Sequence, residues 1–148
     1  MVTVEKAALT DALAQRLIEL SALWVEEDCS WGIVANTRED LKEPLFIARD
    51  GDTVVGYAFG HSYTQEKRTS GIPAGSRCFD VDELYVLPAY RSGGIGRELF
   101  RRLREEAARE ADFITLATST KDYKRILKFY VEELGMDFHN AFLFQNLK

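Results

Sequence analysis

The sequence predicts a single α/β (α+β) domain with a mixed, mostly antiparallel central sheet of six to seven strands, flanked by about four helices. Three observations lead to this fold class. The 148 residues fit one domain that is long enough to bury a proper core. Asp50-Gly51-Asp52 lies between two apolar runs, which is a strong signal for an antiparallel hairpin. Helical stretches over 95–111 and 121–134 alternate with the later strand candidates, and such crossovers place helices on both sides of a sheet.

The first half of the chain indicates a strand, a long helix and the hairpin. Thr10 can cap the helix, whose apolar side chains recur at helical spacing from Leu9 to Trp24. The pattern between Cys29 and Thr37 assigns no element. The predicted elements are a strand over 1–5, a helix ending near 26, a short helical turn over 38–42, and strands over 45–49 and 53–59.

The second half begins with a long polar segment, 60–77, in which glycine recurs. A connection of this length in a compact domain is either a binding loop or a flexible connector. Near the end of the chain, Phe142 and Phe144 alternate with Leu143 and Leu147, which predicts a strand. The predicted elements are a strand over 78–87, a helix over 95–111, a buried strand over 113–117, a helix over 121–134, and strands over 136–140 and 142–147.

The sequence from Asp82 to Gly96 has the pattern of a strand, a turn, a glycine-rich loop and the start of a helix. Free backbone N–H groups at such a helix start bind anions, and the helix dipole favours negative charge there. Two common phosphate loops do not fit. Gly96 is followed by Arg-Glu instead of Lys-Ser/Thr, and the dinucleotide pattern fails because its last position is Leu99. The pattern that fits is Arg-x-x-Gly-x-Gly, formed by Arg91, Gly94 and Gly96.

This loop, with the Leu-Tyr-Val-Leu-Pro-x-Tyr-Arg run that leads into it, resembles the pyrophosphate loop of the GNAT superfamily of acyl-CoA-dependent N-acetyltransferases. Phe129-Tyr130, followed by Leu-Gly-Met, resembles the family's closing Phe-Tyr-x-x-x-Gly-Phe pattern, with one extra residue before Gly135. The predicted order of elements also resembles the GNAT fold over nearly the whole chain. The resemblance implies one GNAT domain over residues 1–148, with acetyl-CoA as the acyl donor.

By this resemblance, the glycine-rich loop holds the coenzyme. Its backbone N–H groups would bind the pyrophosphate, and Arg91 and Arg97 would add positive charge. The strand before the loop would carry a bulge whose free backbone groups bond the pantetheine arm and the acetyl carbonyl. Tyr123 stands where the family often has a pantetheine-binding asparagine, so Asp122 or Ser119 would have to replace it. The implied coenzyme-binding residues are Leu84, Tyr85, Val86, Arg91, Ser92, Gly93, Gly94, Ile95, Gly96 and Arg97.

Transfer to an amine also needs a base for the ammonium proton and an acid for the leaving thiolate. The base candidates are Asp80, Asp82 and Glu83, since members of the family place their base at different ones of these positions. Strand alternation puts Asp80 and Asp82 on one face and Glu83 on the other, unless the bulge intervenes. We favour Asp82 or Glu83, directly or through a water. The alternative is that these carboxylates bind a cationic substrate or face solvent.

The resemblance assigns the general acid to Tyr130, for which the alternative is a core tyrosine on an apolar helix face. The acceptor is expected to be a small cationic amine, such as a polyamine or an aminosugar, because acidic and aromatic side chains gather in the segments that build the acceptor site in such proteins. These are Trp24, Glu26, Glu27, Asp28, Trp31 and residues 61–77. A lysine of a protein or peptide is the nearest alternative, and a non-catalytic acyl-CoA sensor is the alternative of another class. Acetyltransferases of ribosomal-protein N-termini carry a glutamate where this chain has Thr118, which argues against that subgroup.

Composition argues against several other functions. The net charge of −5 gives no general attraction to nucleic acid, and no apolar run approaches the ~20 residues that span a membrane. Cys29, Cys78, His61 and His139 are too few and too scattered for a metal site. The two cysteines indicate a reducing compartment and no secretory leader is recognisable, so we expect a cytoplasmic protein. Aromatic residues in the terminal strands favour either core packing or a homodimer.

Overall fold

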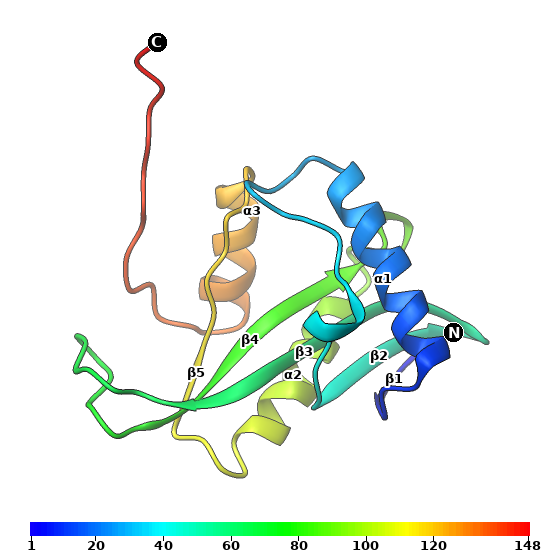
Figure 1. Ribbon diagram of the computed structural model, residues 1–148, viewed down its shortest axis with the longest axis horizontal. Helices are drawn as coiled ribbons and strands as arrows, with labels where there is room; N and C mark the ends of the chain where they lie inside the picture. Colours follow the sequence, from blue (N-terminus) through cyan, green and yellow to red (C-terminus); the bar gives the residue numbers. More distant parts are fainter.

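The computed structural model describes residues 1–148 and confirms a mixed sheet with helices on both faces (Figure 1). The strands lie in the order β1-β2-β3-β4-β5, and neighbours are antiparallel except β4 and β5, which are parallel. The strands are β1 (Val2–Ala7), β2 (Leu45–Asp50), β3 (Thr53–Thr64), β4 (Arg77–Val86) and β5 (Phe113–Thr115). The helices are α1 (Asp11–Glu26), α2 (Ile95–Ala107), α3 (Tyr123–Leu127) and its π-helical continuation η3 (Lys128–Glu133), with short 3₁₀ turns at η1 (Arg38–Asp40) and η2 (Pro88–Tyr90).

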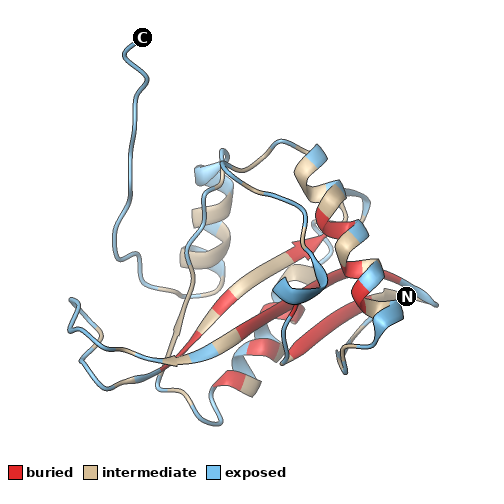
Figure 2. Cartoon of the chain, viewed as in Figure 1, coloured by how far each residue is buried: buried red, intermediate tan, exposed pale blue.

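Each face of the sheet buries its own hydrophobic layer (Figure 2). The layer under α2 includes Phe79, Val81, Leu99, Phe100 and Leu103, and the layer under α1 includes Leu17, Leu20, Tyr57, Phe59 and Tyr85. Burying one side chain of this size contributes roughly 1.5–3 kcal/mol, so the two layers hold the sheet firmly between the helices. None of the helices has both the length and the apolar surface required to cross a membrane.

Two local predictions are confirmed at atomic detail. The Thr10 hydroxyl accepts a 3.2 Å hydrogen bond from the Leu13 N–H and caps α1, which begins at the next residue. The β2–β3 hairpin closes at the pair Asp50–Thr53, and Gly51 has the positive φ of 60° that such a tight turn needs.

The hairpin between β3 and β4 is longer than predicted. β3 continues to Thr64 and β4 begins at Arg77, so the connecting loop is 65–76 instead of 60–77. The end of β3 alternates between half-buried and exposed residues, because only one of its faces is covered there. A polar strand end of this kind lacks the apolar signal on which the prediction depended.

The prediction of strands over 136–140 and 142–147 is wrong, because residues 136–148 form neither strand nor helix. The sheet therefore has five strands instead of six to seven, and three α-helices flank it instead of about four. An alternating pattern shows which faces a strand would bury, but a strand also needs a neighbouring edge to pair with. No residue of this segment pairs with the sheet of its own chain.

Candidate active site

A cavity opens where β4 and β5 separate. The two strands pair only from Cys78–Phe113 to Asp80–Thr115, and they diverge beyond that point (Figure 1). The resulting cavity has a volume of about 570 Å³ and is bordered by the end of β4, the glycine-rich loop, residues after β5, and α3 with η3. Every predicted catalytic and coenzyme-binding residue lines it except Gly93. The fold thus brings together residues that the sequence identified separately.

The glycine-rich loop presents free donors to this cavity. Gly94 takes the left-handed conformation, with φ of 85°, and directly precedes α2. No backbone N–H from Ser92 to Arg97 donates a hydrogen bond within the chain. These groups lie at the positive end of the α2 dipole, where a phosphate is favoured. The loop therefore has the free donors that the predicted pyrophosphate site requires.

Basic side chains from α3 and η3 face the same cavity and were missed by the sequence analysis. Arg125 and Lys128 line it, together with the predicted Arg97. Lys128 has no ion-pair partner, whereas Arg97 lies 3.6 Å from a Glu133 oxygen and Arg125 pairs with Asp122. The spacing of three residues places Arg125 and Lys128 on one helix face, which is the signal that could have identified them.

Arg91 lines the cavity and also makes two contacts within the chain that the sequence did not predict. Its Nε donates to the Val86 carbonyl at 2.8 Å, and its guanidinium forms an ion pair of 2.7 Å with Glu27 at the end of α1. Glu27 also accepts a 2.7 Å hydrogen bond from the Tyr85 hydroxyl, and Trp24 stacks on the Tyr85 ring. The Arg91 side chain thus connects α1 to β4, and its charge is already balanced.

A β-bulge places the three candidate carboxylates on one face of β4. Gly60 pairs with Val81 and Phe59 pairs with Glu83, so Asp82 is the extra residue between them. Regular strand alternation would put Glu83 on the opposite face from Asp80 and Asp82. The bulge instead turns Glu83 to the same face as the other two. The bulge lies just before Leu84–Val86, the segment predicted to bind the coenzyme. A bulge increases the local twist of a strand, and this one lies where β4 separates from β5.

Glu83 is half-buried, and both of its hydrogen-bond donors are neutral. Its Oε1 accepts hydrogen bonds from the Tyr57 hydroxyl at 2.8 Å and from Asn36 Nδ2 at 2.9 Å, while Oε2 has no partner in the chain. Burial raises the pKa of Glu83, although the two hydrogen bonds oppose this shift. Asn36 belongs to the stretch that the sequence left unassigned, and the contact is long-range, so sequence reasoning had no signal for it.

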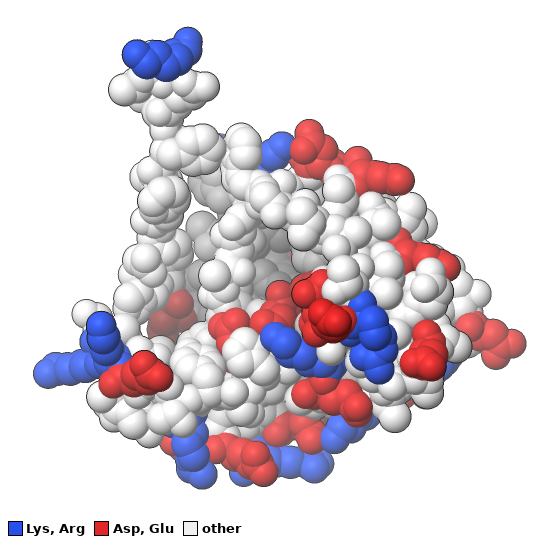
Figure 3. All heavy atoms as spheres, viewed as in Figure 1, with Lys and Arg blue, Asp and Glu red and all other residues white.

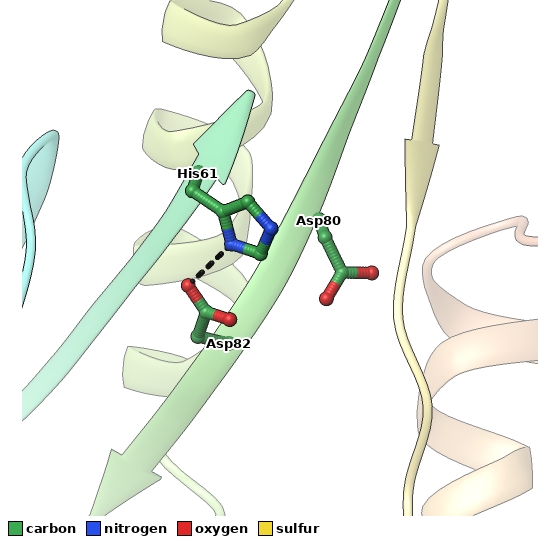
Figure 4. Close-up of side chains that lie close together, drawn as sticks. All are labelled: His61, Asp80 and Asp82. Atoms are coloured by element: carbon green, nitrogen blue, oxygen red, sulfur yellow. Dashed lines mark hydrogen bonds and ion pairs between the residues drawn. The ribbon is translucent and has the colours of Figure 1, made fainter. Parts of the chain in front are cut away.

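The other two carboxylates have close partners (Figure 4). Asp82 lies 2.8 Å from His61 Nδ1 and 3.3 Å from the Lys42 ammonium. Asp80 accepts a 2.7 Å hydrogen bond from the Thr115 hydroxyl and does not line the cavity. His61, Asp80 and Asp82 lie close enough to share a cation, but Lys42 already brings a positive charge to Asp82, so we assign no metal site.

Tyr130 lies in η3 and faces the cavity from the α3 side. Burial raises its pKa to about 12, so the phenol keeps its proton at neutral pH. The π-helix also explains the extra residue in the motif. Leu134 N–H donates to the Phe129 carbonyl, five residues back, and this wider turn accommodates one more residue than an α-helix would.

The predicted acceptor residues are only partly assembled. Trp24 lines the cavity, but Glu27 pairs with Arg91, Asp28 pairs with Lys121, and Glu26 is exposed. Trp31 and residues 61–77 do not line it. Neither Asp122 nor Ser119 does, whereas Thr118 and Thr120 do. In the space-filling view, acidic groups gather along the lower rim of the central hollow (Figure 3).

Known proteins have sequences similar to this chain. Residues 7–136 match the model of the acetyltransferase (GNAT) family. The N-alpha-acetyltransferase RimI of Mycobacterium tuberculosis (strain ATCC 25618 / H37Rv) is 39% identical over 103 residues, which are 68% of this chain and 60% of RimI. The match thus spans less than two thirds of that relative.

Solved structures share the fold over almost the entire chain. An aminoglycoside N-acetyltransferase, AAC(6')-Iy, in complex with CoA superposes with a TM-score of 0.70 at 15% identity, over 99% of this chain and 94% of that one. An acetyltransferase of Trypanosoma brucei gives a TM-score of 0.66 at 21% identity, over 98% of this chain and 100% of that one. Since the family model spans most of the sequence and the motifs lie around one cavity, the chain belongs to the acetyltransferase (GNAT) family.

Proposed function

We propose that this protein transfers an acetyl group from acetyl-CoA to a primary amine, and that the amine is small and cationic, such as a polyamine or an aminosugar. One observation carries the proposal. The same cavity is lined by the start of α2, whose free N–H groups suit an anion, and by the carboxylates Asp82 and Glu83. One end of the cavity suits phosphates, and the other suits a cation.

Coenzyme binding is proposed for the loop N–H groups, aided by Arg97 and Lys128. Bound acetyl-CoA supplies a thioester carbonyl that is already activated toward an amine. Leu84 and Tyr85 present the β4 edge that no longer pairs with β5, and its backbone groups would align the pantetheine arm. Arg91 contributes by holding α1 and β4 together.

Two proton transfers are assigned to side chains. We choose Glu83 over Asp82 as the base because its hydrogen-bond donors are neutral and its Oε2 is free, whereas Asp82 contacts Lys42. Glu83 would take the proton of the acceptor ammonium, directly or through a water. Tyr130 would give its phenolic proton to the leaving thiolate, since its raised pKa keeps it protonated until then.

A second acceptor class is the α-amine of a peptide or protein. The identity of 39% with an N-alpha-acetyltransferase favours it, although Thr118 argues against the ribosomal-protein subgroup. A lysine side chain is the related alternative. For all three acceptors the coenzyme would bind in the same place. Only the group that enters the cavity from the side of the carboxylates would differ.

The test is release of free thiol from acetyl-CoA against a panel of amines. The panel holds polyamines, aminoglycosides, amino acids, lysine-bearing peptides and peptides with free N-termini. We expect turnover with a small polyamine or aminosugar, and turnover slower by about 10²–10⁴-fold with Glu83→Gln at neutral pH. Turnover only with peptides would replace the proposed acceptor, and coenzyme binding without any turnover would favour a sensor.

A further inference from the structure

Residues 28–37, which we call the α1–η1 segment, contain neither a helix nor a strand and bring Asn36 to Glu83. The chain leaves the end of α1, crosses to the residues that precede α3, and returns to η1 (Figure 1). At the crossing, the Trp31 N–H donates a 2.8 Å hydrogen bond to the Ser119 carbonyl. Beyond it, residues 32–36 make no hydrogen bond to another backbone group. This stretch therefore depends on side chains to hold its position.

Ser21 supplies the one hydrogen bond that holds the backbone of this stretch. It lies on α1 and is 1% exposed, and apart from tyrosine it is the only buried residue with a hydroxyl, amide or charged side chain. Its Oγ accepts a 2.9 Å hydrogen bond from the Asn36 N–H and donates one of 2.7 Å to the Ile18 carbonyl. Alanine would form the helix better, because a serine hydroxyl competes for backbone hydrogen bonds. What Ser21 adds is the bond to Asn36.

Asn36 passes this constraint on to Glu83. Its Nδ2 donates a 2.9 Å hydrogen bond to Glu83 Oε1, the oxygen that also accepts from Tyr57. The last torsion of a glutamate side chain is only weakly restrained, so a single donor leaves the carboxylate free to turn. Two donors from different elements, β3 and the α1–η1 segment, hold it with Oε2 unpaired. The contacts from Ser21 through Asn36 to Glu83 thus link the interior of α1 to the cavity.

We propose that Ser21 is a positioning residue for acetyl transfer, which acts through Asn36 to hold the Glu83 carboxylate with Oε2 open to the acceptor ammonium. This inference rests on the proposed function, because it takes Glu83 as the base. Ser21 itself does not line the cavity. Its effect on the reaction is therefore entirely indirect, and it should vanish once Asn36 has lost its amide.

A double-mutant cycle tests this chain of contacts. The variants are Ser21→Ala, Asn36→Ala and the two combined. We expect Asn36→Ala to lower kcat by about 10–100-fold with little change in the KM for acetyl-CoA, because it displaces a reacting group and leaves the coenzyme site intact. Ser21→Ala should lower kcat in the same way, and the double variant should be no slower than Asn36→Ala. Losses that multiply in the double variant would mean independent effects and overturn the proposal.

The matched control is Ser76→Ala. The Ser76 hydroxyl also donates a 2.7 Å hydrogen bond to a carbonyl three residues back, but it lies in the loop between β3 and β4 and does not line the cavity. This control should match the unmodified protein in kcat. Ser21→Cys replaces the alanine variant if that variant does not fold, since a thiol fills nearly the same space but accepts hydrogen bonds only weakly.

The titration of Glu83 gives a second readout that does not depend on turnover. In carbon-13 NMR of protein labelled at glutamate, the Glu83 carboxyl signal is the one that Glu83→Gln removes. The Asn36 hydrogen bond lowers the pKa of Glu83, so Ser21→Ala and Asn36→Ala should both raise that pKa, and the fall of kcat/KM toward low pH should move to higher pH. Asp82 and Asp40, the charged groups that act on Glu83, are the same in all variants.

The two readouts separate failure of this inference from failure of the proposed base. If Ser21→Ala leaves both the titration and the pH profile unshifted while Glu83→Gln abolishes the fall at low pH, Glu83 remains the base and the role of Ser21 is overturned. If the fall at low pH survives Glu83→Gln, the proposed base is wrong and the inference falls with it, even where the titration still shifts.

Discussion

The phenol of Tyr57 donates a 2.8 Å hydrogen bond to Glu83 Oε1, and Asn36 donates a second to the same oxygen. Both donors are neutral, and Oε2 remains free within the chain. Burial raises the pKa of Glu83 while these bonds hold its orientation. A carboxylate that is fixed, partly desolvated and free at one oxygen is suited to accept a proton from an ammonium group.

The first prediction concerns the acid limb of the pH profile, which is the fall of kcat/KM toward low pH. Because the pKa of Glu83 is raised, its basic form is lost as the pH falls through a value above the usual glutamate range. We expect kcat/KM to fall over that window, and Glu83→Gln to abolish the limb and lower kcat by about 10²–10⁴-fold. Asp82→Asn is the control and should retain the limb, since Asp82 is tied to His61 and Lys42. The reverse result would make Asp82 the base.

The second prediction isolates the positioning role of Tyr57. Its hydrogen bond lowers the pKa of Glu83, so Tyr57→Phe should move the acid limb to higher pH while leaving it present. Tyr63→Phe is the matched control, because that phenol lies 3.0 Å from the Thr115 hydroxyl, away from the cavity. A loss of thermal stability without a shift in the limb would mean that Tyr57 serves the core alone.

The proposed coenzyme half of the site could be predicted from the sequence because its residues are close together in the chain. Strand, turn, glycine loop and helix are consecutive, and Gly94 takes the positive φ that its residue type favours. The acceptor half depends on distant contacts. The bulge at Asp82 is set by the register with Phe59 and Gly60, and no sequence pattern linked Asn36 to Glu83. The ion pair of Arg91 with Glu27 could not be predicted for the same reason, since the two residues lie 64 positions apart.

The third prediction tests the anion site. Gly94→Glu would place a negative charge among the free N–H groups at the start of α2. At a few ångströms in a partly screened site this costs about 3 kcal/mol, so the dissociation constant for acetyl-CoA should rise about 100-fold in calorimetry. Gly94→Asn is the control, because asparagine tolerates the left-handed conformation without charge. Equal affinities for the two variants would reject the loop assignment.

The fourth prediction separates two roles of Tyr130. Its hydroxyl has no hydrogen-bond partner in the chain, and its ring packs edge to face against Phe100 and Phe129. Tyr130→Phe keeps the ring, so thermal stability should change little, while kcat should fall about 10²-fold or more with little change in KM. An unchanged kcat would mean that Tyr130 only packs in the core and that solvent protonates the leaving thiolate.

The last prediction compares two arginines at the same cavity. Arg91 bonds Val86 and pairs with half-buried Glu27, so Arg91→Gln leaves a carboxylate without its counter-charge and should lower the free energy of unfolding by about 1–3 kcal/mol. Arg97 is largely exposed, and Arg97→Gln should change that free energy by less than about 0.5 kcal/mol but weaken coenzyme binding. Denaturant unfolding and calorimetry on both variants measure the two effects separately. If Arg91→Gln weakened binding as strongly as Arg97→Gln while stability stayed unchanged, its guanidinium would have to leave Glu27 for the phosphates when the coenzyme binds.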